Sequence, residues 1–219
     1  MQMIPLCRMV EHWSAIQKDR VAIYHDGETI TWGELDRQTN RLARAYEALG
    51  VGQDDFVTIA LPNGIEFFKS TIATWKVGAT PQPVSAKLPK FERDQIVDVG
   101  NPKLITGVPD GSHEGYQTLP TGYEPDPALS DAQLPEKIAS SFKAMTSGGS
   151  TGRPKLIVTT APAVWDIDSD RLHTQIQGSM LIPGPLYHNG PFVWAMSAFF
   201  RGCQITITTR FDAEETLAL

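Results

Sequence analysis

The feature that most constrains the fold is a run of glycine and hydroxyl residues followed at once by a strand-like segment. Residues 146 to 155, Thr-Ser-Gly-Gly-Ser-Thr-Gly-Arg-Pro-Lys, contain three glycines, four hydroxyl side chains and two cations. Glycine lets a ligand approach the main chain closely, and consecutive N–H groups in such a loop can form an anion site. Lys155 adds a compact positive charge. The composition indicates a polyphosphate-binding loop or, in the simplest alternative, an ordinary surface loop.

Two other phosphate or catalytic loops are weaker matches. The Walker-type spacing is missing, and a helix should follow that loop, whereas Pro154 and the β-branched run 156–160 predict a strand. Gly148 to Gly152 matches the G-x-S-x-G elbow of serine hydrolases, with Ser150 as nucleophile. Candidate partners follow in the right order: Asp166, Asp168 and Asp170, then His173 or His188. The elbow also requires a helix directly after the serine, so the same strand-like run disfavours a hydrolase.

Composition limits the class of protein. The 219 residues are 41% hydrophobic and 20% charged, as expected for a globular chain with one large domain or two small ones. A net charge of −6 disfavours nucleic acid as a partner. Cys7 and Cys203 form no C-x-x-C motif, which disfavours a disulfide framework or a zinc site. The first residues lack a signal peptide, and the apolar run 192–200 is too short to span a membrane. We expect a cytoplasmic protein.

Strand-like and helix-like segments alternate along the chain. This alternation predicts an α/β fold with a mostly parallel sheet flanked by helices. The first half predicts a hairpin at 21–30, strands at 55–61 and 103–106, and helices at 31–50, 65–77 and 91–99. The helix that ends at Gly50 begins with the capping box Thr31/Glu34, and the helix at 65–77 has Asn63 and Glu66 as its N-cap pair. Residues 107–135 have no periodicity and predict an irregular internal loop.

The second half continues the pattern. We expect a helix at 161–177, a turn at 185–190, a buried helix from Pro191 to Phe200 and a strand at 203–209. The aspartates within 166–170 are interpreted as a solvated acidic face, so no metal site is predicted. A capped helix begins after Asp212 and meets the end of the chain almost at once, which predicts a fragment cut inside an element.

Several stretches resemble one family. The run Ser147 to Lys155 resembles the phosphate-binding signature of the adenylate-forming superfamily, also called AMP-binding or ANL, which includes acyl-CoA synthetases, luciferases and adenylation domains. The similarity extends over nearly the whole chain from about residue 20. The other matching blocks are 31–35, 51–63, 76–79 and Pro185-Leu186-Tyr187-His188. The Gly-Gly-Ser loop and the residues from Pro185 to Phe192 are most similar to bile-acid-type CoA ligases.

The resemblance implies an incomplete, N-terminal portion of an acyl-CoA-synthetase-type domain. The implied reaction joins a carboxylic acid to coenzyme A through an acyl-adenylate, with ATP and Mg²⁺. It implies that His188 lines the acyl pocket and that Lys155 is catalytic. The implied ligands of the β- and γ-phosphates are Ser147, Gly148, Gly149, Ser150, Thr151, Gly152 and Lys155.

The chain departs from the family pattern in two ways. The family's glutamate motif, ribose-binding aspartate, C-terminal lysine and mobile C-terminal domain have no counterpart before Leu219. The chain alone is therefore expected to be inactive. Thr159-Thr160 stands where many members carry Thr-His. A serine hydrolase using Ser150 and a non-catalytic nucleotide-binding remnant remain the alternatives.

Overall fold

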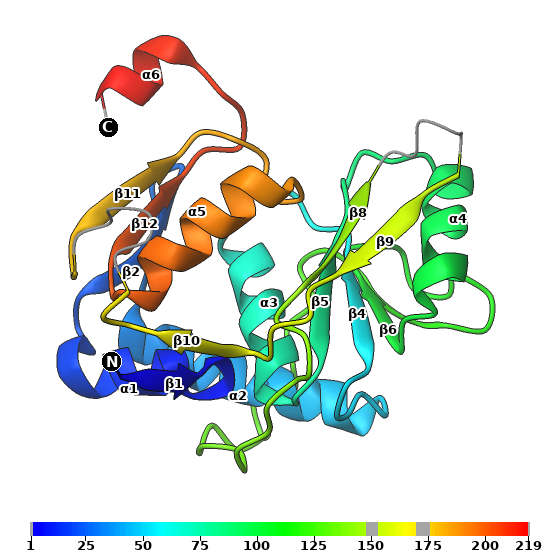
Figure 1. The fold of residues 1–219 in the computed structure, drawn as a ribbon, viewed down its shortest axis with the longest axis horizontal. Helices are drawn as coiled ribbons and strands as arrows, with labels where there is room; N and C mark the ends of the chain where they lie inside the picture. The colour runs from blue at the N-terminus through cyan, green and yellow to red at the C-terminus, as the bar shows by residue number, and fades with distance from the viewer. Residues whose placement is uncertain (1, 148–152, 170–175, 219) are drawn as a thin grey trace.

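The described part of the fold is built on two four-stranded sheets separated by helices, with two two-stranded sheets beside them. A computed structural model describes residues 2–147, 153–169 and 176–218. In Figure 1 one sheet lies on the left and the other on the right, with α3 (Ile65–Lys76) and α5 (Asn189–Phe200) between them. The mixture of mainly parallel strands and covering helices confirms the predicted α/β class.

The first sheet has the strand order β11-β12-β2-β3. β11 (Ser179–Ile182), β12 (Gln204–Ile207) and β2 (Val21–His25) are parallel neighbours, while β3 (Glu28–Thr31) returns antiparallel to β2. Asp26 and Gly27 both have positive φ, so they form the tight turn that the Asp-Gly pair predicts. Segments more than 150 residues apart in sequence therefore meet in this sheet, as the pairing of Ile23 with Ile205 shows.

The second sheet is entirely parallel, with the order β5-β4-β6-β7. Its strands are β4 (Phe56–Ile59), β5 (Thr80–Pro83), β6 (Leu104–Thr106) and β7 (Gln117–Leu119). The last of these is a short regular strand inside the segment expected to be irregular. α4 (Lys90–Gly100) places Ile96 and Val97 in a buried cluster with Ala60 and Ile105 of this sheet region, and thereby covers its outer face.

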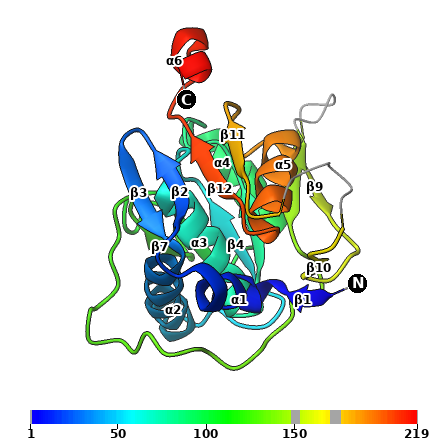
Figure 2. The same ribbon diagram turned by 90° about the vertical axis from the view of Figure 1, so that its left-hand side faces the viewer.

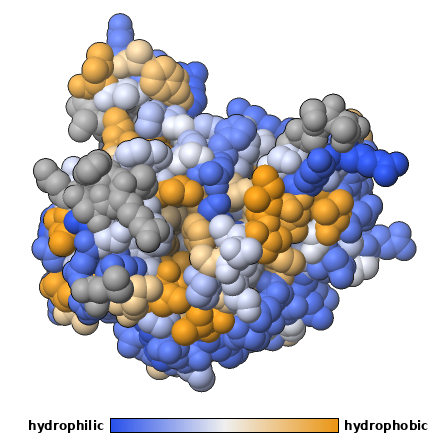
Figure 3. Space-filling view, viewed as in Figure 1, coloured by the Kyte–Doolittle hydropathy of each residue, from blue (hydrophilic) through white to orange (hydrophobic). Residues whose placement is uncertain are grey.

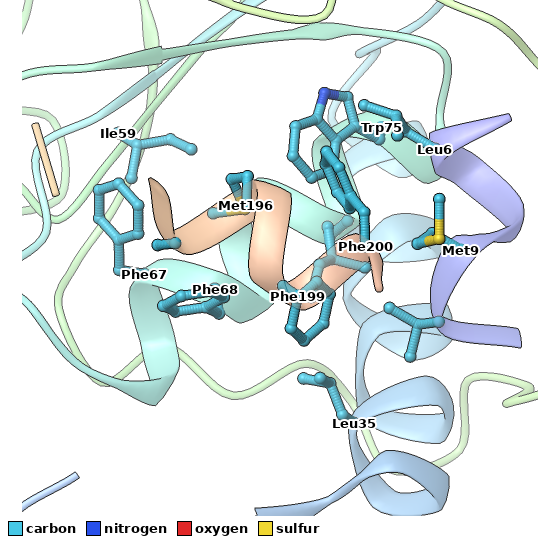
Figure 4. Close-up of a cluster of buried hydrophobic side chains, with 14 of the residues drawn as sticks. Leu6, Met9, Leu35, Ile59, Phe67, Phe68, Trp75, Met196, Phe199 and Phe200 are labelled. Carbon is cyan, nitrogen blue, oxygen red and sulfur yellow. The ribbon is translucent and has the colours of Figure 1, made fainter. Parts of the chain in front are cut away.

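Four helices form the interior. They are α1 (Leu6–Gln17), α2 (Trp32–Ala48), α3 (Ile65–Lys76) and α5 (Asn189–Phe200), and α3 contacts strands of both sheets. Figure 4 shows aromatic side chains of α3 and α5 meeting Leu6 and Met9 of α1 and Leu35 of α2 in the main core. Phe199 stacks on Trp32 with ring centroids 4.6 Å apart and also contacts Phe68 at 5.7 Å. This packing anchors α5, whose first turn borders the candidate site.

Local signals predict several boundaries. Thr31 and Glu34 form both hydrogen bonds of the capping box at the start of α2. α3 ends at Lys76 just before Gly78, which adopts positive φ, and α5 ends at Phe200 as expected. The prediction of Asn63 as a side-chain cap is wrong, because Gly64 occupies the N-cap position and the Asn63 amide bonds to distant backbone groups instead.

The predicted helix at 161–177 is also wrong. Residues Val164–Asp166 form β10, which pairs antiparallel with β1 (Met3–Pro5) at the N-terminal end of the chain. Part of the expected helix, residues 170–175, lies outside the described residues. The pairing of Ile4 with Trp165 is a long-range interaction, and it overrides the weak helical pattern of this segment.

The last described element is α6 (Ala213–Ala218), which projects from the body of the fold in both views (Figures 1 and 2). Leu217 on this helix is 89% exposed. In the part of the chain that the structure describes, no helix has both the length and the apolarity needed to cross a membrane.

Candidate functional site

The phosphate-loop prediction falls on a β-hairpin. β8 (Ala144–Ser147) and β9 (Lys155–Val158) pair antiparallel, with Ser147 directly opposite Lys155. The run 148–152 lies outside the described residues, so five predicted ligands are known only by the strands that flank them. The hairpin thus brings Ser147 and Lys155 to the two ends of the glycine run. A strand, not a helix, follows at Lys155, as the β-branched run predicts.

Thr159 closes the base of this hairpin. Its hydroxyl donates to the Lys143 carbonyl at 2.6 Å and accepts from the Lys143 N–H at 3.3 Å. Ser141 adds a hydroxyl contact to Thr159 at 3.0 Å. The threonine therefore fixes the backbone at the entrance to β8, which gives a structural role to the first residue of the Thr-Thr pair.

The second predicted site residue, His188, ends a turn that starts at Pro185. The His188 N–H donates to the Pro185 carbonyl at 3.1 Å, and His188 is the N-cap residue of α5 without a side-chain cap bond. Its ring lies 4.3 Å from that of Tyr187, centroid to centroid, and the side chain is exposed. The imidazole is therefore available to a ligand.

Asn63, from the β4–α3 connection, holds this turn in place. Its amide nitrogen donates to the carbonyls of Gly184 at 3.1 Å and Thr208 at 3.3 Å, and its oxygen accepts from the Leu186 N–H at 2.9 Å. The sequence analysis missed this role because it assigned Asn63 as the N-cap of the helix that follows it.

A pocket of about 470 Å³ joins the two predicted regions. Its lining includes Thr146, Ser147 and Pro154 from the hairpin and Tyr187 and His188 from the turn. The end of β5 and the first turns of α4, including the 65% exposed Phe91, form the opposite wall. Ligands of parallel α/β sheets commonly bind at the carboxyl ends of strands, and β5 ends here. The structure thus brings Ser147 and His188 to one cavity, whereas Lys155 is exposed and outside its lining.

The pocket has a mixed lining: hydroxyl groups lie at the hairpin, and the α4 wall carries apolar Phe91 and Ile96 beside polar Glu92 and Gln95. The hydroxyl of Thr146 is buried and has no hydrogen-bond partner among the described residues, so it is a donor available to a ligand. In Figure 3 apolar side chains interrupt the polar surface near β9, where Ile157 is 57% exposed. The site can accept an anionic group at the hairpin and an apolar group beside it.

Lys143 directly precedes β8, the first strand of the hairpin, and no sequence motif marks it as a site residue. The residue is 7% exposed, and its ammonium donates to the side-chain oxygen of Asn189, the first residue of α5. It also lies 5.2 Å from the ring centroid of Phe142. Burial lowers the pKa of this lysine from its ordinary value.

Of the residues proposed for a hydrolase, the structure describes Asp166, Asp168 and His188. Asp166 accepts the N–H of Gln2 at 3.1 Å and that of Asp168 at 3.2 Å, beside the β1–β10 pair. Ser150, Asp170 and His173 lie outside the described residues. The described residues contain no group of three or more histidine, cysteine or acidic side chains that could hold a metal ion.

Comparison with known proteins identifies the family. Residues 10–219 match the family model of the AMP-binding enzymes. The chain is 26% identical over 212 residues to the long-chain-fatty-acid–CoA ligase FadD13 of Mycobacterium tuberculosis, covering 87% of this chain and 42% of the relative. It is 29% identical over 156 residues to a probable non-canonical nonribosomal peptide synthetase, CymA, of Salinispora arenicola, covering 67% of this chain and 2% of that protein.

Solved structures share the fold. A fatty acyl CoA synthetase of Mycobacterium tuberculosis superimposes with a TM-score of 0.82 at 18% identity, over 98% of this chain and 46% of that one. The o-succinylbenzoate CoA synthetase of Bacillus subtilis, in complex with its acyl-adenylate intermediate, superimposes with a TM-score of 0.78 at 19% identity. The match covers 99% of this chain and 59% of that one. This chain spans less than half the length of FadD13. With the family model matched over residues 10–219, the chain belongs to the AMP-binding enzymes, the adenylate-forming family.

Proposed function

We propose that this chain is the N-terminal part of an ATP-dependent carboxylic acid–CoA ligase that acts in the cytoplasm. The observation that carries the proposal is the hairpin register that sets Ser147 opposite Lys155, with His188 on the same pocket as Ser147. A carboxylate of the substrate attacks the α-phosphate of ATP and releases pyrophosphate, giving an acyl-adenylate. The thiol of CoA then attacks the acyl carbon and releases AMP.

The glycine loop supplies the phosphate contacts. The hydroxyl of Ser147, the N–H groups and hydroxyls of Gly148 to Gly152, and the ammonium of Lys155 bind the β- and γ-phosphates. These groups fit a polyphosphate because all of them can donate hydrogen bonds to anionic oxygens. A carboxylate nucleophile needs no strong base, so the protein accelerates the step by positioning the reactants and by stabilising charge on the departing pyrophosphate.

No acidic cluster capable of holding a metal lies within the described ranges. We therefore assign no step to a metal held by this chain, and expect Mg²⁺ to arrive bound to the phosphates of ATP.

His188 and the pocket beside it accommodate the acyl side of the reaction. The exposed imidazole next to Tyr187 and the apolar side chain of Phe91 would border an acid with an apolar body. The relatives and solved neighbours that are CoA ligases support this substrate class.

A second function is adenylation for a carrier-bound thiol, because nonribosomal peptide synthetases also occur among the relatives. The two differ in the thiol that accepts the acyl group. We would assay the protein, expressed as its gene encodes it, with a panel of aliphatic, aromatic and steroid acids. Acid-dependent AMP release that requires CoA and yields a thioester supports the ligase. Acid-dependent ATP–pyrophosphate exchange without formation of a CoA thioester supports the carrier-bound route.

The same preparation tests the hydrolase alternative. A fluorophosphonate probe should leave Ser150 unlabelled, because the following segment forms a strand from Lys155 and not the helix that an elbow requires. Labelling that disappears in Ser150→Ala would contradict the proposed function.

A further inference from the structure

The buried lysine at the seam between hairpin and helix differs from the other buried lysines. Lys69 contacts Glu124 at 3.0 Å and Lys76 contacts Asp36 at 2.6 Å, so each has a carboxylate partner. Lys143 is equally buried, yet its ammonium contacts the neutral amide of Asn189. Pairing with a carboxylate therefore does not explain why a lysine is buried at this position.

Stability does not supply that explanation. Burying an ammonium without a neighbouring carboxylate is costly, and an apolar side chain of similar length would fill the same space at a lower cost. The lowered pKa of Lys143 has this desolvation as its cause.

The position of the contact is more informative. The backbone of Lys143 is held by Thr159 and Ser141, so the lysine stem starts from a fixed point at the base of the hairpin. Its ammonium reaches Asn189, the residue directly after His188. One side-chain contact thus links the strand leading into the phosphate loop to the turn carrying His188.

The other side of this turn is fixed independently. Asn63 binds the backbone of Gly184 and Leu186, upstream of His188, while Lys143 acts downstream of it at Asn189. The turn is held at both ends, and the Lys143 contact joins it to the hairpin. Small displacements of a reacting group cost large factors in rate, so such a link has a direct effect on catalysis.

We propose that Lys143 is a positioning residue for adenylation, which through Asn189 holds His188 at a set place relative to the phosphate loop. This inference rests on the proposed function. It adds Lys143, which lies outside the glycine-rich signature, and Asn189, which directly follows His188.

The first test is Lys143→Met in the polypeptide as the gene encodes it. We expect kcat for acid-dependent ATP–pyrophosphate exchange to fall about tenfold or more, while KM for ATP changes by less than about threefold. The thermal midpoint should stay the same or rise, since the buried ammonium that is removed contacts no carboxylate among the described residues. Lys69→Met is the matched control: the residue is also 7% exposed, but it contacts a loop glutamate away from the pocket, and its kcat should not change.

Three further variants separate positioning from a general structural role. Asn189→Leu should lose as much kcat as Lys143→Met, and the double variant should lose no more than either, because both remove one contact. Asn189→Asp keeps an acceptor for the ammonium and should recover most of what Asn189→Leu loses. In a His188→Ala background, Lys143→Met should cost less than about twofold, because the group that it positions is gone.

The outcomes distinguish the two claims. An active wild-type protein whose kcat is unchanged by Lys143→Met, or whose losses multiply in the double variant, overturns this inference alone. Asn189 is exposed, so its variants test the same contact even if Lys143→Met does not fold. A wild-type protein without acid-dependent exchange overturns the proposed function and this inference together.

Discussion

Replacing Asn63 with alanine tests how the His188 turn is held. The variant loses three hydrogen bonds, of 2.9, 3.1 and 3.3 Å, to backbone groups of residues 186, 184 and 208. A net contribution of about 1 kcal/mol per bond gives an upper value of about 3 kcal/mol. Asn63 is half-buried, so water can replace part of this, and we expect a loss of about 1.5–3 kcal/mol.

Urea unfolding followed by tryptophan fluorescence measures this loss in free energy of unfolding. Asn63→Asp is the matched variant: it keeps an acceptor for the Leu186 N–H but faces two carbonyl oxygens with a carboxylate in place of a donor. It should be destabilised at pH 7 at least as much as Asn63→Ala, and partly recover in acid as its carboxyl takes a proton. A loss below about 0.5 kcal/mol for Asn63→Ala would refute the role assigned to the amide.

Three further predictions concern the fold around the site. Phe199→Ala removes a fully buried ring that stacks on Trp32, and should cost about 3–5 kcal/mol in denaturant unfolding; a loss under about 1 kcal/mol would contradict the packing. Gly107 has φ +83°, and Gly107→Ala would place a Cβ 2.4 Å from the Ala60 carbonyl oxygen, so it should cost at least about 2 kcal/mol of stability. Gly111 also has positive φ but faces open space, so Gly111→Ala should cost about 1 kcal/mol. Equal losses for the two variants would count against the clash at Gly107. Burial, then Arg93, lowers the pKa of His113 below its usual 6.5, so the unfolded chain binds the proton more readily and stability should fall as pH drops from about 6.5 towards the folded pKa. His113→Gln should flatten this part of a stability–pH curve, and an unchanged slope would exclude His113 as its source.

The sequence predicts elements whose signals are local. The capping box at Thr31 and Glu34 works as expected because both partners belong to the same helix turn. The strand after the phosphate loop is also local, since Pro154 and the β-branched residues after it disfavour a helix. The pocket, in contrast, requires β5, α4, the hairpin and the His188 turn to meet, and no local signal states which of them are neighbours.

The features that the sequence analysis missed or predicted wrongly depend on contacts between residues far apart in the sequence. Asn63 has the composition of a helix cap, but its amide is engaged by residues more than 120 positions away. Val164–Asp166 form a strand only because the N-terminal strand supplies a partner. Lys143 carries no motif at all, and its contact with Asn189 spans 46 positions. Contacts made by the tertiary structure decide each of these cases.

α1 could have been found from the sequence. Leu6, Met9, Val10 and Trp13 recur at helical spacing and are all buried. The resemblance to the family starts only at about residue 20, so it gives no indication of this helix.

The central claim is that the β8–β9 hairpin binds the polyphosphate of ATP. The most direct measurement is acid-dependent ATP–pyrophosphate exchange by the protein as encoded, compared with its Lys155→Ala variant and with Lys137→Ala, a lysine paired with Glu47 elsewhere on the surface. We predict a fall of about 10²–10³-fold for Lys155→Ala and no change for Lys137→Ala. Exchange that is absent from the wild-type protein, or unaffected by Lys155→Ala, would contradict the claim.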